Sequence, residues 1–171
     1  IYDPSPDANQ TRGSVDNRLV EGIDLIPTFL DALGEPAVPH RLEGRSLLPL
    51  LHGKRVEWRD AAFSEHDYGF MKARLELGLG PSEARSYMVR TERWKYVFFE
   101  GFRAQLFDLV NDPREQRDLG ADPAYDTVRS EMHERLFQWM RRRAIRTTMS
   151  DETVAQRTNT ARDRGIIIEV W

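Results

Sequence analysis

The feature that most constrains this fold is a short apolar segment, residues 105–110, that ends abruptly at Asn111-Asp112-Pro113. Pro113 has a fixed φ and no N–H group, so it cannot continue a central strand, whereas it fits the first position of a helix. Asp112 is then expected as the N-cap, and Glu115 is placed to complete a capping box. The sequence therefore predicts a strand, a tight turn, one helical turn and a stop at Gly120.

Three further segments, residues 60–65, 87–90 and 94–99, are also expected to be strands. Aromatic and β-branched side chains dominate them, as is typical of strands. A long glycine-containing loop, residues 67–85, separates the first of these strands from the second. Together with the segment that ends at Asn111, they predict a small antiparallel sheet of about four strands.

A long helix is expected over residues 125–146. Its apolar side chains recur at helical spacing and fall on one side, which should lie across the sheet. These side chains are Val128, Met132, Leu136, Trp139 and Met140. The predicted fold class is therefore α+β, with a small antiparallel sheet packed by a long C-terminal helix.

The first 58 residues contain a polar loop and then two predicted helices. Asp24 is expected to cap a helix that runs to Leu33, with Gly34 at its C′ position. This helix carries an apolar stripe at helical spacing. The stripe consists of Ile26, Phe29, Leu30 and Leu33. A second, shorter helix is expected over residues 46–51, ended by His52-Gly53.

The last residues, 147–171, change in character and are expected to form an extended C-terminal arm. Ser150-Asp151-Glu152 can start a helix, but the residues that follow are mostly polar. The chain then ends in Ile166-Ile167-Ile168-Glu169-Val170-Trp171, which would promote aggregation if it were left free. We therefore expect the arm to dock, either on its own sheet or on a neighbouring subunit.

Composition excludes several classes of function. A chain of 171 residues with 40% hydrophobic content is long enough for one domain and its core. A formal net charge of −3 gives no electrostatic footprint for nucleic acid. No apolar run approaches the roughly 20 residues of a membrane-spanning helix. The chain has no cysteine, which is compatible with a cytoplasmic location. Neither nucleic acid nor a membrane is therefore an expected partner.

Four segments, in order, resemble motifs of one family. They are Asp24-Leu25-Ile26-Pro27-Thr28, Gly44-Arg45-Ser46-Leu47, Trp58-Arg59-Asp60, and Leu106-Phe107-Asp108-Leu109 with the Asn111-Asp112-Pro113 that follows. Each is similar to a motif in the C-terminal part of sulfatases and phosphonate monoester hydrolases, which belong to the alkaline phosphatase superfamily. One match alone would be weak, whereas four in the right order over residues 23–120 make the resemblance strong.

The resemblance implies that the chain is the C-terminal part of a longer hydrolase whose catalytic groups lie elsewhere. In this family, the nucleophile and the metal ligands lie in the N-terminal part, and no matching motif occurs here. We therefore expect residues 1–58 to complete the parent α/β domain, residues 59–146 to form the sheet and helix subdomain, and residues 147–171 to form the arm. The apolar stripe of the first helix would face the parent sheet.

The resemblance also implies the chemistry and partners of the parent protein. The parent would cleave a sulfate ester, phosphate diester or phosphonate monoester with a divalent metal such as calcium or manganese. The partners expected for this chain are the N-terminal catalytic part of the same protein and further copies bound through the arm. A bacterial cytoplasmic location is expected.

No catalytic residue and no metal ligand is expected within this chain. The strongest site candidates are His66, Tyr68, Arg85 and Arg90, as part of the rim of the parent substrate pocket. An arginine can contact the oxygens of an anionic ester bidentately. Glu65, His66 and Asp67 cannot all converge on one metal ion, because strand neighbours point to opposite faces. The competing interpretation of His66 is an ordinary surface or strand-end histidine.

A second class of function also fits the sequence. A sulfatase-like domain without its catalytic half could serve as a non-enzymatic binding or oligomerisation module. An exposed sheet face and a docking arm would suit that role as well. An upstream Cys/Ser-x-Pro-x-Arg motif would distinguish the enzyme from the module.

Overall fold

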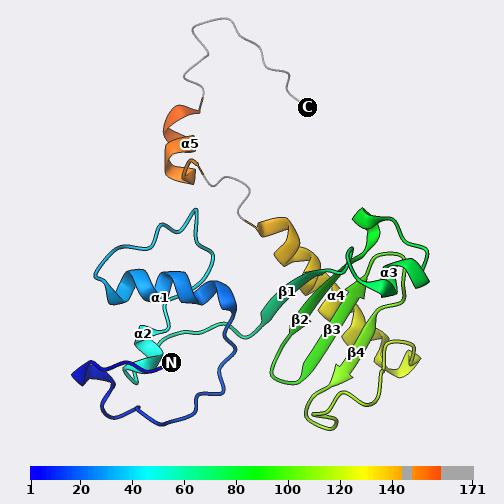
Figure 1. Ribbon diagram of the computed structural model, residues 1–171, viewed down its shortest axis with the longest axis horizontal. Coiled ribbons are helices and arrows are strands. Elements are labelled where there is room, and N and C mark those ends of the chain that lie inside the picture. The colour runs from blue at the N-terminus through cyan, green and yellow to red at the C-terminus, as the bar shows by residue number, and fades with distance from the viewer. Residues whose placement is uncertain (144–147, 159–171) are drawn as a thin grey trace, which may run out of the picture.

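The computed structural model describes residues 1–143 and 148–158. Two regions are visible in Figure 1, a helical region built from the first part of the chain and a sheet covered by a long helix. The chain passes from the first region directly into the first strand of the sheet. We refer to them as the helical region, residues 1–58, and the sheet region, residues 59–142.

The sheet contains four antiparallel strands in the order β1-β2-β3-β4, which confirms the predicted fold class. Their bounds are β1 Ala62–Asp67, β2 Arg85–Arg90, β3 Trp94–Phe99 and β4 Gln105–Asp108. The register places Phe63 opposite Val89, Val89 opposite Tyr96, and Tyr96 opposite Leu106. Since directly opposed residues point to the same face, this row forms the apolar side of the sheet.

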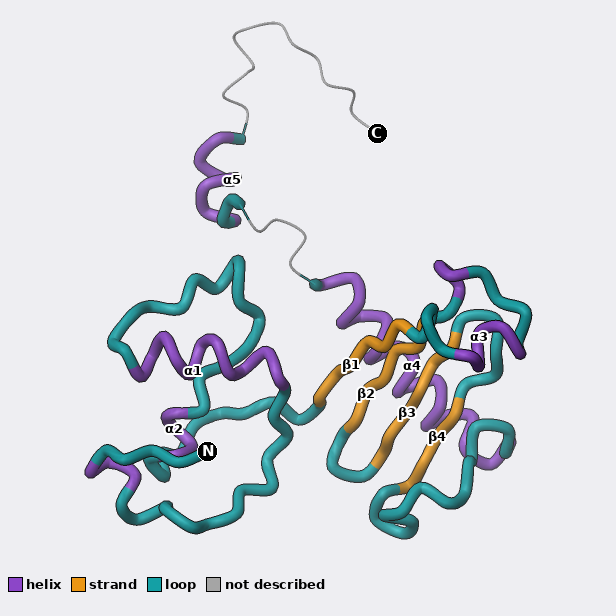
Figure 2. The backbone as a smooth tube through the Cα atoms, viewed as in Figure 1, coloured by secondary structure: helices purple, strands orange, loops and turns teal. Residues whose placement is uncertain are grey.

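Helix α4, Asp126–Arg142, covers that apolar side, as the sequence predicts (Figure 2). Leu106 and Val89 are completely buried beneath it, and Leu136 is 1% exposed. Trp139 stacks on Phe63 with ring centroids 4.9 Å apart. Burial of this cluster is the main source of stability in the sheet region, because removing apolar area from water dominates folding.

The helical region contains α1, Leu25–Ala32, and α2, Leu48–Leu51, close to where the sequence predicts helices. Gly34 ends α1 with a φ of 75°. Its N–H donates to the Asp31 carbonyl, and the Glu35 N–H donates to the Leu30 carbonyl, in the pattern of a Schellman cap. The predicted apolar stripe is present but largely uncovered, with Phe29 57% and Leu33 77% exposed.

The capping box predicted after β4 is wrong. Residues 112–115 form a hydrogen-bonded turn, in which the Glu115 N–H donates to the Asp112 carbonyl, and no helical turn follows. Glu115 adopts a φ of 54°, and its side chain pairs with Lys95 at 2.5 Å instead of capping. Gly120 is required by close packing, because a Cβ there would lie 2.2 Å from the Ala104 carbonyl oxygen.

Two further expectations need correction. The predicted loop over residues 67–85 contains a short helix, α3, Lys72–Glu76. The Asp24 side chain does not cap α1, because backbone N–H groups of other segments and an arginine occupy its carboxylate.

Short elements complete the described chain. The 3₁₀ turns are η1 Pro6–Ala8, η2 Gly22–Asp24, η3 Pro81–Glu83 and η4 Pro123–Tyr125. The helix predicted after Ser150 is α5, Asp151–Arg157, and the Ser150 side chain accepts a hydrogen bond from the Thr153 N–H. The docking of residues 166–171 lies outside the described residues. Within the described part of the chain, no helix is long and apolar enough to cross a membrane.

Candidate functional site

Three of the four family-like segments meet in one buried polar cluster, which we call the hub. At its centre is Asp24, whose side chain is fully buried. Arg59 donates to both Asp24 oxygens, from Nη1 to Oδ2 at 2.7 Å and from Nη2 to Oδ1 at 2.6 Å. The same guanidinium also pairs with Glu21 at 2.7 Å. This bidentate geometry is specific to arginine.

Backbone donors from the Gly44-Arg45-Ser46-Leu47 segment complete the hub. The Arg45 N–H donates to Asp24 Oδ1 at 2.8 Å, and the Leu47 N–H donates to the Thr28 hydroxyl at 2.9 Å. Thr28 in turn donates to the Asp24 carbonyl at 2.6 Å. Gly44 allows this contact, because a Cβ there would lie 2.1 Å from the Ile23 carbonyl oxygen.

The hub holds Asp24 in its ionised form. Burial alone would raise the pKa of this carboxyl, but hydrogen bonds from Arg59 and from the Arg45 and Glu21 N–H groups outweigh it, so the pKa lies below its ordinary value of 3.8. Arg59 is shared between two carboxylates, so each charged group in the hub has a partner inside the protein. With its hydrogen bonds taken up inside the protein, the Asp24 carboxylate connects segments of the fold and does not serve as a proton donor or acceptor.

The hub also ties the helical region to the sheet. The Phe63 N–H of β1 donates to Glu21 Oε1 at 2.6 Å, and the Trp58 indole N–H donates to the Leu19 carbonyl at 2.7 Å. The guanidinium of Arg59 lies over the Trp58 ring, 5.4 Å from its centroid. The motifs that identify the family thus build the joint between the two regions.

The fourth family-like segment organises the turn after β4. Asp108 is 5% exposed and accepts hydrogen bonds from the Val110 and Asn111 N–H groups and from the Asn111 side chain at 2.9 Å. Arg93 pairs with the same carboxylate at 2.9 Å. The hydrogen bond from Arg93 lowers the pKa of Asp108, and those from Asn111 add to this effect. This segment is therefore structural as well.

The structure brings two of the four predicted rim residues together. His66 and Tyr68 line one groove, with ring centroids 6.3 Å apart. Arg85 does not line it, because it follows the alternation of Tyr87 and Val89 toward the α4 side of the sheet. Arg90 lies at the opposite end of β2, across from Ala62. The role of all four in a substrate rim stays a prediction.

The groove that contains His66 and Tyr68 lies at the end of the sheet where β1 ends and β2 begins. It has a volume of about 380 Å³. Its walls come from the strands and from the segment that carries α3, and we call it the sheet–loop groove. Its lining residues are His66, Tyr68, Met71, Ala73, Leu77, Ser86, Phe99, Phe102, Arg103 and Gln105. Sequence reasoning missed Ser86 and Phe99, although their alternation with buried strand residues places them on the open face.

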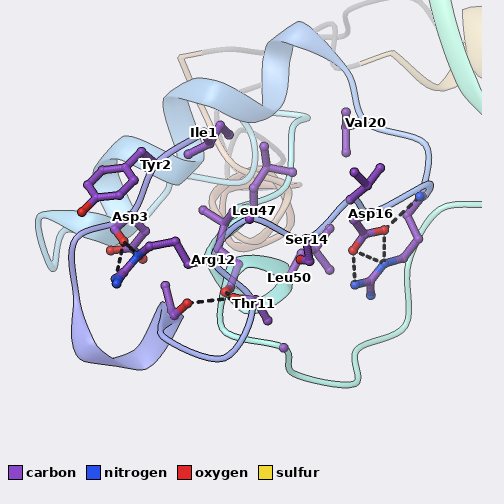
Figure 3. Close-up of a pocket in the computed structure, with 16 residues that line it drawn as sticks. Ile1, Tyr2, Asp3, Thr11, Arg12, Ser14, Asp16, Val20, Leu47 and Leu50 are labelled. Atoms are coloured by element: carbon purple, nitrogen blue, oxygen red, sulfur yellow. Dashed lines mark hydrogen bonds and ion pairs between the residues drawn. The ribbon is translucent and has the colours of Figure 1, made fainter.

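A second pocket, of about 420 Å³, lies between the first 20 residues and α2 (Figure 3). His52 pairs with Asp3 at 2.9 Å, and the Arg12 guanidinium donates to the Asp3 and Ser5 carbonyls at 2.9 and 3.0 Å. No sequence pattern predicts the contact between Asp3 and His52, because 49 positions separate the two residues. The Asp3–His52 pair and a hydrogen bond from the Thr11 hydroxyl to the Leu51 carbonyl hold the N-terminal loop on α2, and Arg12 closes the loop on itself.

No metal centre forms within the described residues, because no three His, Cys, Asp or Glu side chains gather there that could hold an ion. The expectation that this chain ligates no metal stays a prediction.

The sheet and its backing helix are shared with the C-terminal part of sulfatases and phosphonate monoester hydrolases, which belong to the alkaline phosphatase superfamily. The chain belongs to the family described as N-sulphoglucosamine sulphohydrolase, C-terminal, whose model matches residues 6–142. It is 33% identical over 147 residues to the multifunctional alkaline phosphatase superfamily protein PehA of Trinickia caryophylli, covering 82% of this chain and 28% of PehA.

Two further similarities agree with this assignment. The chain is 31% identical to the ulvan-active sulfatase of Formosa agariphila, covering 75% of this chain and 30% of that protein. The crystal structure of the phosphonate monoester hydrolase of Agrobacterium radiobacter matches with a TM-score of 0.68 at 35% identity, over 84% of this chain and 28% of that one. The chain therefore spans less than a third of the length of these relatives.

Proposed function

We propose that this chain is the C-terminal part of a metal-dependent hydrolase that cleaves a sulfate ester, a phosphate diester or a phosphonate monoester. The observation that carries the proposal is family membership, with relatives that are sulfatases and phosphonate monoester hydrolases. In this proposal, the chain supplies packing, part of the pocket wall and subunit contacts. The nucleophile and the metal ligands come from the preceding part of the protein.

The uncovered apolar surface of the helical region supports this division. Ile26 and Phe29 on α1 are 53% and 57% exposed, and Ile1 and Val15 in the N-terminal loop are 77% and 86% exposed. Several large apolar side chains this exposed in one region are typical of a surface that contacts another one. In the proposal, that surface is the sheet of the parent domain.

The metal, calcium or manganese, is assigned to the preceding part of the protein. The described residues of this chain do not fit a metal, because they contain no cluster of three suitable side chains. A bound metal would stabilise the charge on the group being transferred.

The test compares the full-length protein with the 171-residue chain on a sulfate ester, a phosphate diester and a phosphonate monoester. We expect the full-length protein to hydrolyse at least one of them and to lose this activity on chelation, while the chain hydrolyses none. A full-length protein that cleaves none of the three, or a chain that is active by itself, would overturn the proposal.

A non-enzymatic binding or oligomerisation module is the second candidate. It is favoured by a specific observation, namely that the family motifs build a structural hub and that a groove lies open at the far end of β1. A full-length protein that binds a small ligand but hydrolyses no ester would support this alternative.

The proposed partners and location are tested separately. We propose that copies associate through residues 147–171 in a bacterial cytoplasm. Light scattering measures the number of copies in each particle. We expect fewer copies when the full-length protein is truncated after residue 158. An unchanged number of copies in the truncated protein would remove these last residues from the contact.

A further inference from the structure

A cluster of exposed apolar side chains surrounds α3, and we call it the α3 patch. Its members are Phe70, Met71, Leu75, Leu77 and Phe102, each more than 40% exposed. Phe70 lies just before the helix and is completely exposed. Met71, Leu77 and Phe102 line the sheet–loop groove, so they share one surface. Apolar side chains gathered in this way are typical of a surface that contacts another one.

The α3 patch is separate from the apolar stripe of α1. Strand β1 begins beside the hub, where the Phe63 N–H donates to Glu21, and it ends at Asp67, shortly before the patch. Its six residues span about 17 Å. Figure 1 shows the strands of the sheet between α1 and α3. The surface that covers the α1 stripe therefore lies at the other end of β1, and the α3 patch is a second contact surface.

The segment that carries the patch is braced by hydrogen bonds. The Tyr68 N–H donates to the Ala84 carbonyl at 2.9 Å, which closes the segment at its base. Arg74 donates to the Gly69 carbonyl at 2.7 Å and to the Leu79 carbonyl at 2.9 Å, which ties the two halves of the segment together. The patch is therefore preformed, and a preformed surface loses less entropy when it binds a partner.

The α3 patch combines a projection with a hollow. Phe70 projects into solvent, and the sheet–loop groove lies beside the same helix. The groove has a volume of about 380 Å³, which exceeds that of one phenylalanine side chain, and its walls include Tyr68 and Phe99. Aromatic rings pack well against such walls. A surface with both a projection and a matching hollow is complementary to a second copy of itself.

The charges on α3 suit the same partner. Lys72 and Glu76 pair at 2.9 Å and are 86% and 61% exposed, so both can be reached from outside. The middle residue of the helix is Arg74, whose guanidinium is taken up by carbonyls of its own segment. Two α3 helices packed antiparallel about Arg74 place Lys72 of each copy opposite Glu76 of the other. A partner with a strong charge of one sign would instead meet both signs here.

The same arrangement brings Phe70 to the groove of the other copy. Phe70 precedes α3, and Leu77 follows it directly. In an antiparallel pair, the start of one helix lies beside the end of the other. Phe70 of one copy therefore meets Leu77 of the other copy, and Leu77 lines the groove.

We propose that two copies of the protein associate through the α3 patch about a two-fold axis, with Phe70 of each copy in the sheet–loop groove of the other. An isologous contact of this kind uses the same residues twice. It goes beyond the function proposed above and uses none of the residues 147–171.

The test measures self-association of the full-length protein by sedimentation equilibrium over a range of concentrations. Phe70→Ser removes the projection, and Phe137→Ser removes an exposed phenylalanine of α4 as the matched control. Both side chains are at least 47% exposed, so both variants should fold. We expect Phe70→Ser to weaken association about thirtyfold, as for an aromatic hot spot, and Phe137→Ser to change it less than about twofold.

A charge reversal tests the two-fold arrangement itself. Lys72→Glu should weaken association about tenfold, because like charges then face each other across the axis. Adding Glu76→Lys to Lys72→Glu restores opposite charges, and we expect association within about threefold of the wild type. A double variant that associates no better than Lys72→Glu alone would overturn the antiparallel pairing of the two helices.

Other occupants of the groove give different results. Equal association of Phe70→Ser and the wild type would overturn the proposal, and a lower melting temperature of that variant would then place the patch against the preceding part of the same molecule. The effect of Phe70→Ser should persist when the protein is truncated after residue 158. If truncation abolishes this effect, the last residues of the chain occupy the groove, and the proposal fails. None of these measurements uses a substrate, so their outcome is independent of the proposed hydrolase activity.

Discussion

The helical region and the sheet region are stabilised by different kinds of contact. The sheet region buries a continuous apolar cluster between the strands β2, β3 and β4 and helix α4, in which Val89, Leu106 and Leu136 are at most 1% exposed. The helical region buries few large apolar side chains and is joined to the sheet region by the ion pair between Asp24 and Arg59, the first residue of the sheet region. The sheet region therefore has its own apolar core, whereas the helical region is held mainly by polar contacts.

This difference explains where the apolar surface lies. In the sheet region, the apolar face of α4 is used by the sheet of the same chain. In the helical region, the hub binds the polar residues at the start of α1, whereas Phe29 and Leu33 on its apolar side stay exposed. A buried ion pair contributes specific geometry but little net stability, because the desolvation of both charges offsets their attraction. The stability of the helical region should therefore depend more than that of the sheet region on contact with a surface outside this chain.

The largest expected effect comes from breaking the hub. Arg59→Ala leaves the buried Asp24 carboxylate without its counter-charge, since only backbone N–H groups remain on it. We expect the free energy of unfolding to fall by about 3–5 kcal/mol, as for other broken buried pairs. Urea denaturation followed by tryptophan fluorescence measures it, because Trp58 lies beside Arg59.

Arg55→Ala is the matched control, because Arg55 is an exposed arginine in the same linking segment. Its unfolding free energy should stay within about 0.5 kcal/mol of the wild type. Equal stability of Arg59→Ala and Arg55→Ala would show that the hub does not stabilise the joint.

Truncating the core should have a somewhat smaller effect. Leu136→Ala removes a side chain that is 1% exposed beneath the sheet, and we expect a loss of about 3 kcal/mol from lost burial and the cavity that remains. Phe137→Ala, its neighbour on α4, is 47% exposed and should cost less than about 1 kcal/mol. Thermal unfolding measures the stability of both variants. A lower stability for Phe137→Ala than for Leu136→Ala would contradict the assigned core.

Acid should weaken the hub in a defined pH window. The folded pKa of Asp24 is lowered, so its contribution is complete above the unfolded pKa near 3.8 and is lost as the pH falls below that value toward the folded pKa. Unfolding free energies measured between pH 6 and pH 3 should fall more steeply for the wild type than for Asp24→Asn. Parallel pH profiles for the two proteins would exclude Asp24 as a source of this acid sensitivity.

Residues whose partners are close in the sequence were predictable, whereas those with distant partners were not. Strand alternation and the apolar spacing from Val128 to Met140 indicated the sheet and its helix, because both patterns repeat locally. Asp24 was misassigned as a helix cap, since Arg59 and the Arg45 N–H, 35 and 21 positions away, take its carboxylate. Local propensity cannot predict whether the Asp24 carboxylate binds a distant arginine or the N–H groups at the start of the helix.

The same limit applies to the turn after β4 and to the groove. The pattern from Asp112 to Glu115 fits a capping box, but Lys95 on the neighbouring strand pairs with Glu115 instead. Of the residues predicted for a substrate rim, His66 and Tyr68 line one groove, whereas Arg85 points to the α4 side by strand alternation. Which residues share a cavity depends on register, and register becomes visible only when the strands are paired.

The smallest effect on the chain itself is expected at the uncovered stripe of α1. Phe29→Lys places a charge at a position that is 57% exposed, so the 171-residue chain should change its unfolding free energy by less than about 0.5 kcal/mol. In the full-length protein, the same charge would be buried against the parent sheet, and we expect a loss of several kcal/mol. Glu35→Lys, just beyond the end of α1 and also exposed, is the control that introduces a positive charge by reversing an existing one, outside the stripe. If Phe29→Lys is as harmless in the full-length protein as in the chain, the stripe faces water, and the helical region needs no partner beyond its own hub.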